Sequence, residues 1–336
     1  MNFILSFLSN FAANVIYYSI FAFGILLRIL PFPLKKFVTG VVATLWFYLF
    51  PFRKRVILHN LALVFPRRSE ESNKHFQSRC EAISRRNIQH YLLMLLEVFE
   101  RLTWSNETAR AQAVWDHHER MQALVDQGTG FFFLSLHLGN WETLTRVGCA
   151  EGLPLTIITR YLRNPVMDRV WVKSRKQFGL ELLAESGSGL AAIKSVKRGR
   201  ALGFISDQHT GEPHGIEATF LGHPAWCPKA LAMMADRLKA PVLPIALIRD
   251  MDTGTCRIFV EEVMSFPRID PKHSEFDASL RSGSGALNHK GLQYFIEETN
   301  KPLEAWIRRF PEQYLWIHKR FKNFLDYSKE PLPWEL

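Results

Sequence analysis

From Gly130 onward, short apolar runs alternate with longer amphipathic stretches, and this alternation restricts the fold more than any other feature. Runs of strand length occupy 131–136, 155–159, 201–206, 242–248 and 256–261. Stretches of helix length lie between the first four runs, over 140–151, 165–178, 189–197 and 228–238. Nearly continuous apolar strands separated by helices are typical of a parallel sheet covered on both faces. We therefore predict an α/β fold with a mostly parallel central sheet flanked by helices.

The segments on either side of this region have other patterns. Apolar residues recur at helical spacing over 53–65, 71–101, 110–127 and 292–310, and we predict helices there. The polar stretch 264–290, which contains Pro267 and Pro271, predicts a loop. The aromatic and basic run over 314–322 is more typical of a packed helix than of a binding site.

The N-terminal part of the chain predicts contact with a membrane. Residues 1–27 carry no charge, 15–27 are strongly apolar, and cations follow from Arg28 onward. An excess of cations after an apolar segment places that side in the cytoplasm. A second apolar stretch, 37–52, is suited to the membrane interface. We predict a membrane anchor and interfacial segment over 1–52, including an N-terminal membrane-anchoring helix, and a catalytic domain over 53–336. A helical hairpin packed on the core stays open as the alternative.

The end of the first apolar run carries the strongest chemical signal. The run Phe131-Phe132-Phe133-Leu134-Ser135-Leu136 is followed by His137, then by Gly139 and Asn140, which suit a turn and a helix N-cap. Glu142 follows five positions after the histidine. An imidazole at a strand end with a carboxylate to orient it is suited to general base catalysis. We predict His137 as the base and Glu142 as its partner.

Two further polar residues follow predicted strands directly. Arg160 comes after the run 155–159, and Asp207 comes after the run 201–206. The carboxyl ends of parallel strands meet at one edge of a sheet, so we predict that Arg160 and Asp207 join His137 in a substrate site. A solvated basic face and a helix-capping aspartate are the alternative interpretations.

Net charge and residue content indicate which partners, thiol states and metal sites to expect. The net charge of +10 favours an anionic partner such as acidic lipid or an acidic carrier protein, and the 26 phenylalanines favour membrane over nucleic acid. No nucleic-acid-binding motif is present. Cys80, Cys149, Cys227 and Cys256 form no Cys-x-x-Cys pair and predict reduced, buried thiols. The histidines and glutamate at 209, 212, 214 and 223 match no metal signature, so we predict no metal site.

The residues His137-Leu138-Gly139-Asn140-Trp141-Glu142 resemble the His-x4-Glu signature of the bacterial lipid A late acyltransferases, which include lauroyl and myristoyl transferases. Three other stretches are similar to that family. They are Asn60-Leu61-Ala62-Leu63-Val64-Phe65-Pro66, Asp207-Gln208 and Pro311-Glu312-Gln313-Tyr314-Leu315-Trp316. A histidine with an acid is common to all glycerolipid acyltransferases, whereas the last stretch is more specific.

The resemblance implies a glycerolipid-acyltransferase-like enzyme on the cytoplasmic face of the bacterial inner membrane. It would move a fatty acyl chain from an acyl-carrier-protein or acyl-CoA thioester to a hydroxyl of a lipid A precursor or related glycolipid, with no other cofactor. His137 would be the base, Glu142 its partner, Arg160 a ligand for an anionic part of the acceptor, and Asp207 an acidic site residue.

One segment departs from the family pattern. The family carries a phenylalanine-rich segment followed by small hydroxyl residues, whereas this chain has Phe220-Leu221-Gly222 and then Trp226-Cys227-Pro228. The departure leaves acyl length and acceptor open. A lysophospholipid or mannosylated lipid as acceptor, and a non-catalytic lipid-binding protein, stay as alternatives.

Overall fold

The computed structural model describes residues 2–50, 52–185, 187–265 and 279–336. Most of the predicted loop over 264–290 therefore lies outside the described residues. Within them, seven strands form one sheet in the order β1-β9-β8-β2-β5-β3-β4. The strands are β1 (Ala113–Asp116), β2 (Phe131–Ser135), β3 (Leu155–Thr159), β4 (Glu181–Ala184), β5 (Ala201–Ile205), β8 (Val242–Arg249) and β9 (Cys256–Val260).

The pairing confirms the predicted mostly parallel sheet. Every neighbouring pair of strands runs parallel except β8 and β9, which are antiparallel. In register, Phe131 faces Ala201 on one side of β2 and Phe132 faces Val242 on the other. Since β2 lies between β5 and β8, its end is at the centre of the sheet.

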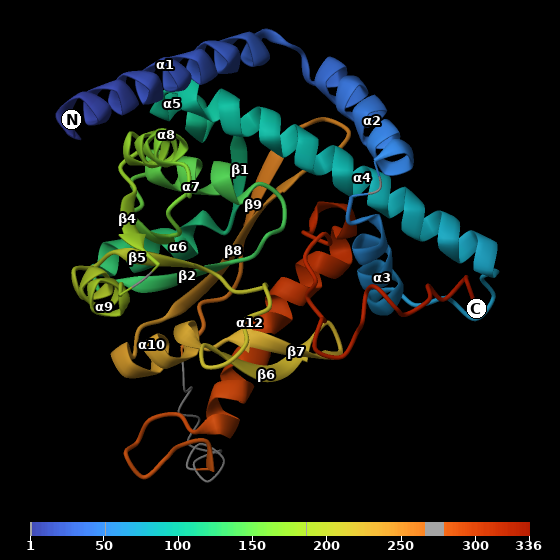
Figure 1. The fold of residues 1–336 in the computed structure, drawn as a ribbon. Coiled ribbons are helices and arrows are strands. Elements are labelled where there is room, and N and C mark those ends of the chain that lie inside the picture. Colours follow the sequence, from blue (N-terminus) through green and yellow to red (C-terminus); the bar gives the residue numbers. More distant parts are fainter. Residues whose placement is uncertain (1, 51, 186, 266–278) are drawn as a thin grey trace.

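Helices cover both faces of this sheet (Figure 1). Alternate side chains of β2 enter different hydrophobic clusters, Phe132 and Leu134 in one and Phe131 and Phe133 in the other. The helices are α3 (Lys54–Val64), α4 (Asn73–Glu100), α5 (Asn106–Arg110), α6 (His118–Gln127), α7 (Trp141–Ala150), α8 (Pro165–Lys176), α9 (Gly189–Lys197), α10 (Ala230–Leu238) and α12 (His289–Arg309), with short 3-10 turns η1 (Arg101–Thr103) and η3 (Pro311–Gln313). Burial on both faces explains why the strands are apolar without alternation.

Two N-terminal helices, α1 (Asn2–Ile29) and α2 (Phe32–Leu49), arch over one side of the molecule (Figure 1). They pack on α4, and α1 also packs on α8. The segment Asn10–Ile29 is long and apolar enough to cross a membrane, and 22% of its apolar window is buried. Large apolar side chains such as Phe11, Leu26, Ile29, Phe37 and Leu49 are exposed along both helices. We call the outward side of α1 and α2 the apolar band.

Three details of the predicted secondary structure are wrong or incomplete. The stretch 110–127 begins with strand β1, because Ala113–Asp116 pairs with β9 before α6 starts. The run over 314–322 forms turns, because Asn60 and Asn87 donate side-chain hydrogen bonds to its carbonyls. The pattern also did not predict β4 or the antiparallel hairpin β6 (Gly215–Phe220) and β7 (His223–Pro228).

Candidate active site

The turn between β2 and α7 positions His137. Gly139 has a φ of +61°, and a Cβ built there would lie 1.7 Å from the carbonyl oxygen of Leu247. Only glycine fits this close approach to the backbone of β8. Asn140 then caps α7, since its Oδ1 accepts the Thr143 backbone N–H at 3.0 Å. The sequence prediction of a turn and an N-cap at these positions is confirmed.

The imidazole of His137 is held by Asp207. Its Nδ1 lies 2.8 Å from Oδ1 of Asp207, and its backbone N–H donates to Oδ2 of the same carboxylate at 3.1 Å. The pair forms because β5 lies directly beside β2, so that both residues follow neighbouring parallel strands. The Asp207 side chain is 1% exposed and the His137 side chain is 19% exposed. One partner is therefore sealed in the protein and the other reaches solvent.

The charge state of Asp207 fixes the tautomer of His137. Burial by itself raises the pKa of Asp207, but the neighbouring His137 and the hydrogen bonds from it bring that pKa below its usual value. A carboxylate can only accept, so we assign the proton on the neutral imidazole to Nδ1. The Nε2 atom is then unprotonated, and the Gln208 amide N–H donates a long hydrogen bond of 3.4 Å to it. This is the arrangement that a general base requires.

The predicted contact between His137 and Glu142 is wrong. Trp141 is the first residue of α7 and its ring packs edge-on against the imidazole, with 4.8 Å between the centroids. Successive helical side chains point about 100° apart, so Glu142 turns into the protein instead. Its carboxylate lies 2.8 Å from the guanidinium of Arg101 and 2.5 Å from that of Arg175. Burial raises the pKa of Glu142, but the two arginines lower it below its usual value.

The C-terminal segment braces the His137 turn from the other side. The Leu315 backbone N–H donates to the His137 carbonyl at 2.9 Å, and the Gly139 N–H donates to the Gln313 carbonyl at 3.1 Å. The hydroxyl of Tyr314 donates to the backbone carbonyl of Asp207 at 3.4 Å. The Pro-Glu-Gln-Tyr-Leu-Trp stretch therefore contacts both members of the histidine–aspartate pair.

Two helices hold the C-terminal segment and the His137 turn in place. From α3, the Asn60 amide donates to the carbonyls of Trp316 and His318 at 2.7 and 2.9 Å. From α4, the His90 Nε2 donates to the Gly139 carbonyl at 3.1 Å, and the Tyr91 hydroxyl donates to the His137 carbonyl at 3.3 Å. The stretches that resemble the acyltransferase family, although far apart in the sequence, therefore meet around His137.

A second histidine, His318, lies on the aspartate side of the site. Burial is the main reason that its pKa falls to about 4, and Arg320 and His137 lower it further while Asp207 opposes the shift. Its Nε2 accepts the His209 backbone N–H at 3.0 Å, as a neutral imidazole must. No sequence pattern identifies His318 as a site residue, because its neighbours come from distant segments.

Arg160 lies at the predicted edge of the sheet but is not bonded to the histidine pair. It follows β3, which neighbours β5, so the three strand ends are adjacent as expected. Its guanidinium is 81% exposed and forms an ion pair with Glu185, with Nε 2.7 Å from Oε2. The structure thus brings His137 and Asp207 into contact and leaves Arg160 at the surface.

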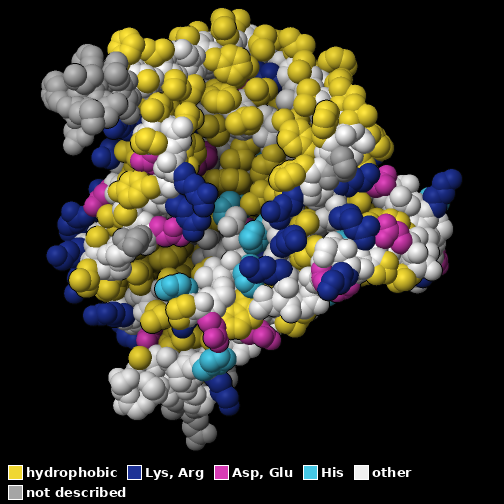
Figure 2. Space-filling view, viewed as in Figure 1, with side chains coloured by type: hydrophobic (Ala, Val, Ile, Leu, Met, Phe, Trp, Pro, Cys, Tyr) yellow, Lys and Arg dark blue, Asp and Glu magenta, His cyan; other side chains and the backbone are white. Residues whose placement is uncertain are grey.

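The space-filling view shows the face on which these strands end. A hollow lies between the apolar band above and the rest of the molecule below, with histidine side chains inside it and lysines and arginines around its rim (Figure 2). A hollow bounded by apolar and cationic side chains is suited to an anionic amphipathic ligand.

The cysteines and the possible metal ligands of the described residues form no second site. The four cysteines are free, and burial raises the pKa of Cys80 and Cys256 to about 12 and that of Cys149 to about 11. These three thiols are protonated near neutral pH and are poor nucleophiles. Among the residues that the structure describes, no group of three or more His, Cys, Asp or Glu side chains could hold a metal ion.

Comparisons with known proteins identify the family of this chain. A family model described as bacterial lipid A biosynthesis acyltransferase matches residues 6–323. Lipid A biosynthesis acyltransferase 2 of Shigella flexneri is 22% identical over 335 residues, 98% of either chain. The lipid A biosynthesis palmitoleoyltransferase of Escherichia coli K12 is 22% identical over 88% of this chain and 87% of its own. The myristoyltransferase of the same strain is 23% identical over 81% and 75%. The chain belongs to the bacterial lipid A biosynthesis acyltransferase family.

Proposed function

We propose that this protein transfers a fatty acyl group from an acyl-carrier-protein or acyl-CoA thioester to a hydroxyl of a lipid A precursor or related glycolipid. The contact between the buried Asp207 carboxylate and the partly exposed His137 imidazole carries the proposal. The names of the relatives support the lipid A acceptor. The mostly parallel sheet, with the histidine after a central strand, supports a glycerolipid-acyltransferase-like fold.

In this proposal the residues act in one displacement without an acyl-enzyme. The Nε2 atom of His137 takes the proton of the acceptor hydroxyl, and the oxygen attacks the thioester carbonyl. The tetrahedral intermediate collapses, the carbon–sulfur bond breaks, and the imidazolium returns its proton to the leaving thiolate. Asp207 stabilises the imidazolium between these two steps. Glu142 acts at a distance, by fixing the start of α7 between Arg101 and Arg175.

Arg160 is proposed to bind an anionic group of the acceptor. Its bond to Glu185 joins two exposed side chains and is weak in water, so a phosphate can replace the glutamate. The apolar band is proposed to anchor residues 1–52 in the inner membrane, with residues 53–336 on the cytoplasmic side. This places the acceptor, which is itself a membrane lipid, beside the sheet edge.

The test is acyl transfer by purified protein with His137→Ala as the variant. We expect a folded variant whose rate falls about 10²–10⁴-fold. Substantial transfer by that variant would overturn the assignment of the base. Parallel assays with lysophospholipid and mannosylated acceptors identify the acceptor. Lipid binding without turnover by the unaltered protein would support the non-catalytic alternative.

The identity of the acyl donor is tested by measuring the rate of transfer at increasing salt concentration. A carrier protein that is strongly acidic is attracted by the cationic rim, and salt at about 0.15 M already screens charges beyond about 8 Å. We expect kcat/KM with a carrier-bound donor to fall steeply as salt rises. A rate that does not respond to salt would make acyl-CoA the preferred donor.

A further inference from the structure

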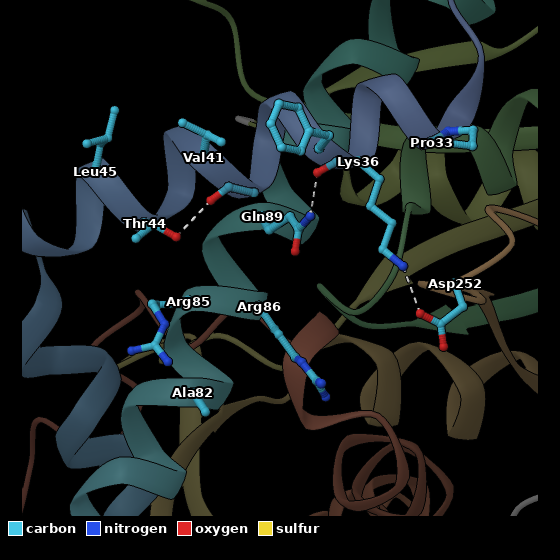
Figure 3. A pocket seen from close by; sticks show the side chains of 12 residues that line it. Pro33, Lys36, Val41, Thr44, Leu45, Ala82, Arg85, Arg86, Gln89 and Asp252 are labelled. Carbon is cyan, nitrogen blue, oxygen red and sulfur yellow. Dashed lines mark hydrogen bonds and ion pairs between the residues drawn. The ribbon is translucent and has the colours of Figure 1, made fainter.

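A groove runs between α2 and α4, outside the site described above. Its volume is about 860 Å³. The wall from α2 includes Phe37, Val41 and Leu45, and the wall from α4 includes Arg85 and Arg86 (Figure 3). The groove therefore joins an apolar side to a cationic side along two antiparallel helices.

The apolar wall belongs to the surface that we assigned to the membrane. Phe37, Val41 and Leu45 recur every four residues and are 69%, 44% and 51% exposed. Residues at this spacing form a single stripe on a helix, and this stripe is part of the apolar band. An acyl chain lying against it would be buried on one side by protein and on the other by the bilayer.

The cationic wall has two guanidinium groups that form no ion pair with any carboxylate among the described residues. Arg85 donates to the Tyr48 hydroxyl at 3.0 Å and makes no other hydrogen bond with a residue that the structure describes. Arg86 is exposed and makes no hydrogen bond or ion pair within the described part of the chain. The third cation of the groove, Lys36, is paired with Asp252 at 2.8 Å at the other end (Figure 3). The uncompensated positive charge is therefore concentrated at the arginine end.

We propose that this groove binds one anionic phospholipid of the bilayer, with its phosphodiester on Arg85 and Arg86 and an acyl chain against Phe37, Val41 and Leu45. Guanidinium groups bind phosphate oxygens in a bidentate fork, which favours a phosphate-bearing headgroup. The occupant comes from the bilayer because the apolar wall is continuous with the membrane-facing band.

The groove lies on α4, so a bound lipid would also affect the part of the protein that this helix holds. The same helix holds the His137 turn through His90 and Tyr91. A lipid that bridges α2 and α4 stabilises this helix against the membrane-facing layer. Membrane attachment and the position of the catalytic turn then depend on one element.

The experiment measures the lipid that remains bound to full-length protein. The protein is extracted in detergent, incubated with phosphatidylglycerol or phosphatidylcholine, washed, and analysed by native mass spectrometry. Arg85→Gln with Arg86→Gln removes the cationic wall, and Ala82→Leu fills the groove without changing charge. Lys194→Gln with Lys197→Gln is the matched control, because it removes two exposed charges from α9, on a different part of the fold.

We expect one phosphatidylglycerol per chain in the unaltered protein and in the control, and weaker binding by about tenfold or more in both groove variants. Melting temperatures show whether each variant is folded. Equal retention by all proteins, or equal retention of phosphatidylcholine, would overturn the proposal. Displacement of phosphatidylglycerol by a lipid A precursor would also overturn it, by making the groove part of the acceptor site. None of these outcomes depends on acyl transfer, so the proposed activity is tested separately.

Discussion

The carboxylate of Asp207 holds His137 at two points, with Oδ1 2.8 Å from the imidazole Nδ1 and Oδ2 3.1 Å from the backbone nitrogen. One contact fixes the tautomer and the other fixes the position of the residue. The two contacts have different requirements. The backbone N–H needs only a hydrogen-bond acceptor, whereas an imidazolium needs a negative charge beside it to be stabilised.

Asp207→Asn is predicted to distinguish the structural contact from the electrostatic one. The amide oxygen can still accept one hydrogen bond, so the fold is retained, but the charge that stabilises the imidazolium is lost. We expect kcat to fall about 10²–10⁴-fold with little change in melting temperature. Steady-state kinetics and a thermal melt measure both quantities. A variant that keeps its kcat would show that the aspartate only positions the turn.

Glu142→Gln is predicted to act mainly on stability. Removing the charge leaves Arg101 and Arg175 with no full counter-charge in the interior, and breaking such a buried pair costs about 3–5 kcal/mol. Glu151→Gln is the matched control, because Glu151 follows α7 and its ion pair with Arg110 is partly exposed and 3.7 Å long. That change should cost about 1 kcal/mol or less.

Chemical denaturation of both variants gives the free energies of unfolding. A Glu142→Gln protein of unchanged stability but greatly reduced kcat would contradict this account. That result would instead favour the role that the sequence predicted for Glu142, next to the reacting groups.

Gly139→Ala is predicted to disrupt the turn that holds His137. Its Cβ would lie 1.7 Å from the Leu247 carbonyl oxygen, so the backbone of the turn or of β8 must move. Gly128 is the control, because its φ of +63° is similar but its Cβ would meet nothing within 4 Å. Gly128→Ala should therefore show only the backbone cost of about 1–2 kcal/mol. Similar melting temperatures for the two variants would refute the importance of this close approach.

The stability of the protein is predicted to fall as the pH falls from about 7 to about 5. Burial lowers the pKa of His318 to about 4 and that of His90 to about 3, so in this range the unfolded chain binds protons that the folded chain excludes. The stabilisation is complete above the unfolded pKa of about 6.5 and decreases toward the folded values. Melting temperatures across this range check the direction. His318→Gln should reduce the slope, and an unchanged slope would exclude His318 as a source.

The sequence alone determined the class of fold and the place of the candidate site. The runs 131–136 and 201–206 are too short and too uniformly apolar for surface helices, and the structure has β2 and β5 there. His137 and Asp207 follow these runs directly, so their location at one sheet edge could be predicted from local pattern. The glycine and asparagine of the turn were also recognisable, because their conformational roles are local.

The tertiary structure alone decided which side chains touch. Strand order depends on contacts between distant segments, and only the placement of β5 beside β2 brings Asp207, rather than Glu142, to the imidazole. The rotation of α7 about its own axis then points the Glu142 side chain toward Arg101 and Arg175, which come from two other segments. Hydrophobic periodicity predicts which side chains are buried but not which residues they contact, because those contacts depend on the packing of the whole chain.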